Sequence, residues 1–165
     1  MILELDKRLE FLSEIAAMIE TTLKEENAEI LIPQALPGIV CDRPRIAEVF
    51  RNLIVNGIKY NDKPRKVVEI GYLDAIKTNE GDITEAFYVR DNGIGIEREF
   101  HTEIFRIFKR LNAESDAKRG TGVGLTFVKK IIERHGGRIW LESTPGRGTT
   151  FYFTIKRGMP NVQAA

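Results

Sequence analysis

The chain has 165 residues, of which 42% are apolar and 30% are charged, a composition typical of one globular domain that can bury its own core. Its formal net charge of +1 argues against a dedicated nucleic-acid binder, which needs a broad basic surface. Cys41 is the single cysteine, so an intramolecular disulfide is excluded. No apolar run is long enough to span a membrane, and we expect a cytoplasmic protein without direct membrane contact.

Hydrophobic periodicity divides the first part of the chain into helices and strands. Apolar residues at helical spacing predict helices over 7–24 and 43–60, the second with Asp42 as its N-cap and a proline in its first turn. A strand is expected over 28–32, and the apolar residues 38–41 favour a shorter one. Residues 61–64 interrupt the helical pattern and predict a turn.

The second part of the chain is rich in strands. One more helix is expected over 123–134, and a segment of mixed, partly helical character over 97–108. The polar, aperiodic residues 111–119 read as a mobile loop. Strands are predicted over 67–72, 86–90, 138–142 and 149–155. We expect one domain over 1–158 and a disordered tail over 159–165.

One face of the 43–60 helix carries a polar stripe. Its residues are spaced by four, four and three, and at ~100° per residue they fall within an arc of about 80°. They are Glu48, Asn52, Asn56 and Lys59. Oxygen ligands and an ammonium group on one face suit a magnesium ion with phosphates, although a solvated helix face would explain the same pattern. Two asparagines in mid-helix favour the functional interpretation, because asparagine is a poor helix former.

Two glycine-containing loops follow. The first begins with Asp91 at the end of a predicted strand, and its carboxylate is suited to accept a hydrogen bond from an adenine amine. The second has glycines at alternate positions 120, 122 and 124, where a helix begins, and a helix N-terminus favours phosphate. A tight turn would explain the first loop equally well. Neither loop has the spacing of a P-loop or of a dinucleotide-binding motif.

The order of these motifs resembles the sensor histidine kinases. Asn52 to Tyr60, Asp91 to Gly95, the pair Phe105 and Phe108, and Gly120 to Leu125 correspond to the N, G1, F and G2 boxes of that family. Residues 146–151 resemble its last glycine-containing strand motif, and the run from Glu103 to Ile155 resembles kinases attached to phytochrome-type photoreceptors. Gly57 stands where the family often has alanine.

The resemblance implies the catalytic ATP-binding domain of the gyrase, chaperone, histidine kinase and mismatch-repair ATPase superfamily. Its fold would be an α/β two-layer sandwich, a mixed sheet with helices packed on one face and a mobile ATP lid over 97–119. Glu48 and Asn52 would be catalytic, and Asn56 and Asn52 would bind Mg²⁺. The ATP-binding residues would be Asn56, Lys59, Tyr60, Asp91, Gly93, Ile94, Gly95, Ile96, Phe105, Lys109, Arg110, Gly120, Thr121, Gly122, Val123, Gly124, Leu125 and Thr149.

The resemblance has one large departure. A complete kinase also carries a two-helix dimerisation domain with a phospho-accepting histidine, and neither His101 nor His135 matches that motif. His135 is expected to contact the end of the 123–134 helix instead. We therefore expect a monomer that binds ATP and transfers the γ-phosphoryl group to a histidine elsewhere, with a response regulator downstream. A nucleotide-sensing module and an ATPase of the same superfamily are the alternatives, the latter disfavoured by Asn52 in place of a carboxylate.

Overall fold

The computed structural model describes residues 5–106 and 124–156. Its helices are α1 (Leu5–Met18), α2 (Glu20–Glu25), α3 (Arg43–Lys59) and α4 (Gly124–Arg134), with short 3-10 helices η1 (Arg98–Phe100) and η2 (Glu103–Phe105). Its strands are β1 (Ala28–Leu31), β2 (Lys66–Lys77), β3 (Ile83–Asp91), β4 (Ile139–Thr144) and β5 (Gly148–Phe153). Apart from the short strand expected over 38–41, the predicted helix–strand order is therefore confirmed for the described part of the chain.

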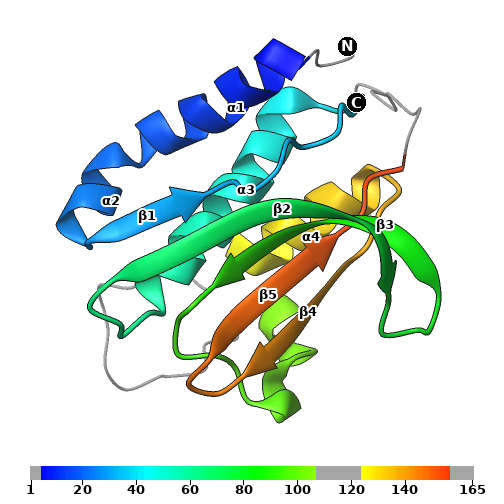
Figure 1. Cartoon of the computed structure of the whole chain (residues 1–165). Coiled ribbons are helices and arrows are strands. Elements are labelled where there is room, and N and C mark those ends of the chain that lie inside the picture. Colours follow the sequence, from blue (N-terminus) through cyan, green and yellow to red (C-terminus); the bar gives the residue numbers. More distant parts are fainter. Residues whose placement is uncertain (1–4, 107–123, 157–165) are drawn as a thin grey trace.

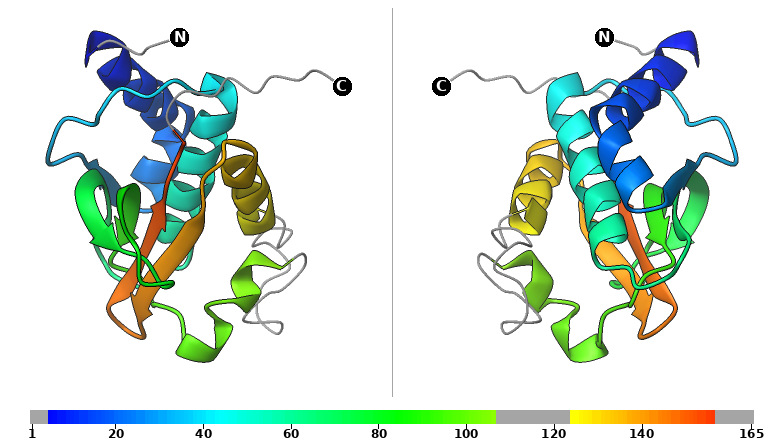
Figure 2. Two further views of the ribbon diagram at one scale, coloured as in Figure 1. Left: turned by 90° about the vertical axis from the view of Figure 1, so that its right-hand side faces the viewer. Right: turned by 90° about the vertical axis from the view of Figure 1, so that its left-hand side faces the viewer.

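The strands form one mixed sheet in the order β1-β2-β3-β5-β4. β1 pairs with β2 in parallel, and every other neighbouring pair is antiparallel. Figures 1 and 2 place α1, α3 and α4 on one face of this sheet. The expected two-layer α/β sandwich is confirmed.

Strand alternation supplies the two faces of the sheet with different residues. The helix-facing side contributes Val89, Phe151 and Phe153 to the main core, where they meet the buried residues of α3 and α4. On the opposite side, a smaller cluster contains Ala86, Tyr88, Trp140 and Tyr152. Asp91 and Thr149, at one end of this sheet, belong to the helix-facing set because they follow the same alternation as Val89 and Phe151.

Several element boundaries differ from the sequence prediction. The helix expected over 7–24 is divided at Ile19, whose backbone leaves helical angles (φ −117°, ψ 14°) while its side chain is buried in the core. The segment 38–41 forms only an isolated bridge at Val40. β2 and β3 extend far beyond the expected ranges, because their pairing continues through a register shift between Leu73 and Ile76. Among the described residues, no helix has the length and apolarity needed to cross a membrane.

Candidate functional site

The carboxylate of Asp91 is the centre of the candidate site. Its Oδ1 accepts hydrogen bonds from the backbone amides of Gly93 (2.8 Å) and Thr149 (3.2 Å). Burial raises the pKa of Asp91 from 3.8 to about 6, and the two amide hydrogen bonds only partly offset that increase. Within residues 5–106 and 124–156, the groups that lower this pKa are two backbone amides and not a cation.

Gly57 gives α3 its close approach to this carboxylate. A Cβ placed on Gly57 would lie 2.9 Å from the Asp91 Cβ and 3.5 Å from its Oδ2. Real Cβ atoms do not approach this closely, so any side chain here would displace the helix or the strand. Gly57, which stands where the family often has alanine, thus leaves Oδ2 of Asp91 next to a part of the α3 surface that carries no side chain.

The first glycine loop is attached to the C-terminus of α3. Ile94 donates its amide to the carbonyl of Tyr60 (3.0 Å), and Gly93 packs so tightly that a Cβ there would lie 2.4 Å from the same oxygen. Gly95 has φ +73°, a conformation that favours glycine. The side chains of Tyr60 and Ile94 are 44% and 37% exposed, so both present apolar surface to solvent close to Asp91.

Asn92, directly after Asp91, has a structural role. Its Oδ1 accepts from the Asn61 side chain (2.8 Å) and from the amide of Val67 (2.9 Å), and its Nδ2 donates to the carbonyl of Arg65 (3.0 Å). Asn61 is itself buried and accepts from the amide of Lys63, which confirms the turn predicted at 61–64. The hydrogen-bonding groups of Asn92 are therefore used to fix the loop, whereas Asp91 keeps one oxygen for another donor.

Thr149 faces the same space from β5. Its amide bonds to Asp91, and its hydroxyl lies 2.9 Å from that of Ser143, its cross-strand partner on β4. Thr149 is buried, with 5% of its surface exposed. The sequence-predicted pair Asp91 and Thr149 is thus brought together by the β3–β5 pairing.

The polar stripe of α3 is present, with Asp42 as the N-cap of the helix. Asn52 donates its Nδ2 to the carbonyl of Glu48 (2.8 Å), which orients its Oδ1 away from its own helix. That oxygen faces the start of α4, since a Cβ on Gly124 would lie 3.0 Å from it. Asn52 and Gly124, predicted as members of one site, are therefore neighbours in the structure.

The other members of the stripe lie at the two ends of this surface. Glu48 forms an ion pair with Arg45 at 3.7 Å. The ammonium of Lys59 lies 4.9 Å from the ring centroid of Tyr60. Asn56 is half-buried and immediately precedes Gly57, which places it at the Asp91 end of the helix. The donor set of two amide oxygens suits Mg²⁺, which takes hard oxygen ligands and completes its shell with phosphates and water.

Phe105, Leu125 and Ile96 pack against the main core. The ring of Phe105 makes an edge contact with Phe151 at 6.2 Å, and its carbonyl accepts from the buried Thr126 hydroxyl (3.1 Å). Phe105 is therefore attached to both β5 and α4. Lys109, Arg110, Gly120, Thr121, Gly122 and Val123 lie outside the described residues, as do Phe108 and most of the predicted lid.

The two histidines contact backbone carbonyls. The His135 Nδ1 lies 2.8 Å from the carbonyl of Ile131 in the last turn of α4, which confirms its expected contact with the helix end. Its Nε2 accepts from the amide of Asp42, the N-cap of α3. The His101 Nε2 lies 3.0 Å from the carbonyl of Ile96. Among the described residues, no three His, Cys, Asp or Glu side chains gather as a metal site.

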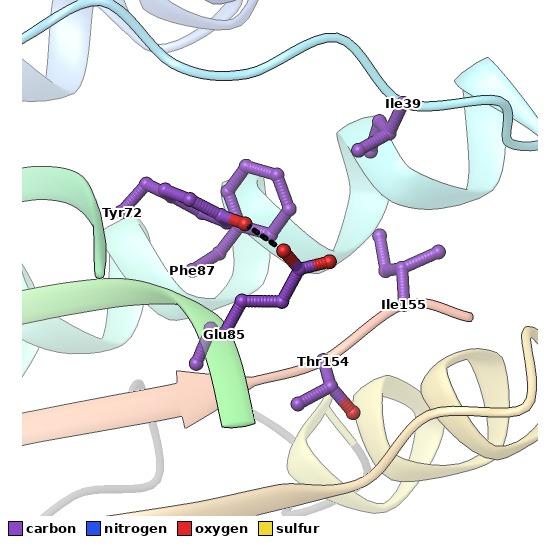
Figure 3. A pocket seen from close by; sticks show the side chains of 7 residues that line it. Ile39, Tyr72, Glu85, Phe87, Thr154 and Ile155 are labelled. Carbon is purple, nitrogen blue, oxygen red and sulfur yellow. Dashed lines mark hydrogen bonds between the residues drawn. The ribbon is translucent and has the colours of Figure 1, made fainter. Parts of the chain in front are cut away.

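Two hollows in the described structure differ in size. The smaller, of about 10 Å³, lies between the sheet and the segment before α3, and Tyr72 donates to Glu85 in its wall (Figure 3). It has room for about one water molecule and none for a nucleotide. The larger, of about 240 Å³, lies at the Asp91 end of the sheet. Its lining residues are Arg90, Asp91, Glu142, Ser143, Thr144, Arg147, Gly148, Thr149 and Thr150.

Sequence reasoning missed Ser143 and the contact between Gly57 and Asp91. The alternation of β4 carried a signal for Ser143, because it places this polar residue on the same face as the buried Leu141. The contact of Gly57 had no local signal, since it depends on how closely α3 packs on the sheet.

Comparisons with known proteins agree with this geometry. The model of the family described as "Histidine kinase-, DNA gyrase B-, and HSP90-like ATPase" matches residues 41–159. Cyanobacterial phytochrome B of Nostoc sp. strain PCC 7120 is 53% identical over 147 residues, 89% of this chain and 19% of that protein. The methanogenesis regulatory histidine kinase FilI of Methanothrix harundinacea is 37% identical over 88% of this chain and 16% of its own length. The chain thus spans less than a fifth of these curated relatives.

Solved structures give the same result at the level of the fold. The catalytic domain of histidine kinase ThkA superposes with a TM-score of 0.69 and 27% identity, over 90% of this chain and 91% of that one. A second structure contains ThkA in complex with the response regulator protein TrrA (TM-score 0.67, 25% identity, 90% of this chain and 40% of that one).

Proposed function

Because the chain belongs to the family of histidine kinase-, DNA gyrase B-, and HSP90-like ATPases, we propose that it binds Mg-ATP and donates the γ-phosphoryl group to a histidine on a separate dimerisation domain. The observation that carries the proposal is the half-buried carboxylate of Asp91, which has one oxygen held by two amides and a raised pKa. A half-buried carboxylate without a cationic partner among the described residues is suited to a ligand that donates a hydrogen bond, and the adenine amine is such a donor.

In this account Asp91 accepts the adenine amine through Oδ2, and Thr149 contacts the base through a water molecule. Tyr60 and Ile94, whose side chains are exposed near Asp91, border the base and ribose. The glycines of the second loop allow its backbone to approach the phosphates. Lys59 supplies a positive charge to them.

Asn52 and Asn56 are the residues that would hold Mg²⁺, through their amide oxygens. When bound, the ion would neutralise charge on the phosphate oxygens. The amide of Asn52 is already oriented for this by its bond to the Glu48 carbonyl, so its Oδ1 needs no rearrangement to face a ligand.

In the transfer step, an imidazole nitrogen of the acceptor histidine attacks the γ-phosphorus while the bond to the β–γ bridging oxygen breaks and ADP leaves. Glu48, one turn before Asn52, would accept the imidazole proton. The acceptor histidine belongs to a dimerisation domain on the same parent chain or another, a response regulator acts downstream, and the isolated chain is a monomer in the cytoplasm, where ATP is available.

The proposal is tested by mixing this chain with a histidine-bearing dimerisation domain from a phytochrome-type kinase and ATP labelled at the γ-phosphate. We expect label on the histidine with the unsubstituted chain, and none with Asp91→Asn. Asp62→Asn, at an exposed carboxylate, is the matched control and should transfer normally. Label in the absence of this chain, or unchanged transfer by Asp91→Asn, would contradict the proposal.

Three further outcomes test the role of Glu48 and separate the alternatives. An unchanged transfer rate in Glu48→Ala would exclude Glu48 as the base. ATP binding without any transfer to the supplied histidine would favour a nucleotide-sensing module instead, while release of inorganic phosphate without a histidine would favour an ATPase.

A further inference from the structure

Ser143 occupies an unusual position on β4. It stands on the helix-facing side of the strand and is half-buried, beside the buried Leu141. Its hydroxyl makes three contacts, with the amide of Ile96 (2.8 Å), the carbonyl of Gly148 (2.9 Å) and the hydroxyl of Thr149 (2.9 Å). These contacts join the first glycine loop to the strand that carries Thr149.

The chemistry of the three partners determines the direction of each hydrogen bond. A serine hydroxyl has one proton and two lone pairs. The amide of Ile96 occupies one lone pair, and the carbonyl of Gly148, which can only accept, takes the proton. The remaining lone pair of Ser143 accepts the proton of Thr149, so the Thr149 hydroxyl has only lone pairs left for another partner.

A second contact keeps the loop and the β4–β5 turn together. Gly146 in the turn donates its amide to the carbonyl of Ile94 in the loop (2.7 Å). Gly95 packs against the turn so closely that a Cβ on it would lie 2.3 Å from the carbonyl of Thr144. Ser143 therefore connects the first glycine loop to the β4–β5 turn, two segments that backbone contacts already hold together. Its hydroxyl fixes the orientation of the Thr149 hydroxyl beside Asp91.

We propose that Ser143 is a positioning residue for adenine recognition: it holds Thr149 as a hydrogen-bond acceptor next to the carboxylate of Asp91. This inference rests on the proposed function. Two neighbouring acceptors match an exocyclic amine, which has two hydrogens to donate directly or through water. Hypoxanthine has a carbonyl at that position, and the same two acceptors disfavour it. Without Ser143, the Thr149 hydroxyl can rotate and donate to such a carbonyl.

The test is calorimetric titration of the chain with ADP and with IDP, both in the presence of Mg²⁺. Ser143→Ala should weaken ADP binding roughly three- to tenfold, the effect of one lost hydrogen bond, and leave IDP binding unchanged or tighter. Ser143→Thr keeps the hydroxyl and should restore the preference for ADP. Thr84→Val is the matched control, because it removes a hydroxyl from the end of β3 away from Asp91, where Thr84 donates to the carbonyl of Glu85.

The ratio of ADP to IDP affinity separates positioning from a general loss of stability. If Ser143→Ala destabilises the fold, Ser143→Cys keeps the shape with only a weak hydrogen-bonding group and gives the same test. An unchanged ADP affinity, or equal weakening of ADP and IDP, would overturn the inference while the proposed function stands. Failure of the unsubstituted chain to bind ADP would contradict the proposed function and this inference with it.

Discussion

The two faces of strands β3, β5 and β4 differ in how completely their polar side chains are paired. On the face without helices, the hydroxyl of Tyr88 donates to Glu69 (2.7 Å), and the guanidinium of Arg90 lies over the Tyr88 ring and 3.7 Å from Glu69. Tyr152 donates likewise to Glu142 (3.1 Å). Burial, followed by the hydrogen bond to Glu69, raises the pKa of Tyr88 to about 12, so its hydroxyl stays protonated and donates.

On the helix-facing side, Asp91 has neither a cation nor a side-chain donor among the described residues. Its pKa of about 6 means that the fold favours the neutral form, yet the group is charged at neutral pH. Charged groups in paired, partly exposed positions add little to function or stability. A half-buried carboxylate with a raised pKa that the fold leaves incompletely satisfied is instead the expected signature of a ligand site.

The largest effect should follow from Asp91→Asn. The substitution replaces the Oδ2 acceptor by an amide donor opposite the adenine amine, so ADP affinity should fall by roughly 100-fold or more. The shift that ADP causes in the denaturation midpoint should vanish in this variant. Asp62→Asn should retain the shift, and its loss there as well would mean that charge alone, not position, controls binding.

The same carboxylate should make stability depend on pH. Its pKa is about 6 in the folded chain and 3.8 ordinarily, so the folded state binds the extra proton between these values. The contribution of Asp91 to the free energy of unfolding is therefore fully present below pH 3.8 and is lost as pH rises through 6, by up to about 3 kcal/mol for a two-unit shift.

Denaturant unfolding of the unsubstituted chain and of Asp91→Asn between pH 4 and pH 7.5 checks this sign. The variant should be the more stable of the two at pH 7.5, and the difference should shrink toward zero as the pH falls. A difference that is constant with pH would show that Asp91 titrates normally in the folded chain.

A smaller effect is expected from Gly57→Ala, which places a methyl group 2.9 Å from the Asp91 Cβ. Overpacking of this kind costs about 1–3 kcal/mol. The displaced carboxylate should also bind ADP several-fold more weakly. Arg51→Ala, at an exposed position of α3, is the control and should change neither property. Tighter binding by Gly57→Ala would mean that α3 moves away from the strand without cost.

The smallest effect should come from the opposite face. Tyr88→Phe removes one hydrogen bond to Glu69, which keeps its contact with Arg90, and should cost about 0.5–1 kcal/mol of stability. ADP affinity, measured by calorimetry, should not change. A loss of affinity comparable with that of Gly57→Ala would contradict the separation of the two faces.

The sequence was sufficient for those features that depend on local pattern. The helical periodicity of residues 43–60 and the N-cap Asp42 predicted α3 to within a residue, and strand alternation predicted β3 and its end at Asp91. The motif order predicted which residues to expect together, and Asp91, Thr149 and Gly93 do meet. The functional roles of these residues remain predictions.

Features that depend on tertiary contacts could not be read from local pattern. Residues 83–85 belong to β3 because β2 pairs with Ile83 and Thr84 beyond a register shift, and backbone pairing of this kind leaves no periodic apolar pattern in the sequence. The break between α1 and α2 falls at Ile19, a buried residue that continues the apolar periodicity, so the local pattern did not reveal it. The three contacts of the Ser143 hydroxyl depend both on the β4–β5 register and on the path of the first glycine loop.

The most direct test of the account is an NMR titration of the Asp91 carboxyl carbon in the free chain and in the presence of saturating ADP. We predict a pKa of about 6 in the free chain and a lower one in the complex, because a donated hydrogen bond from adenine favours the charged carboxylate. A pKa near 4 in the free chain, or one that ADP leaves unchanged, would contradict the claim that this carboxylate is reserved for the base.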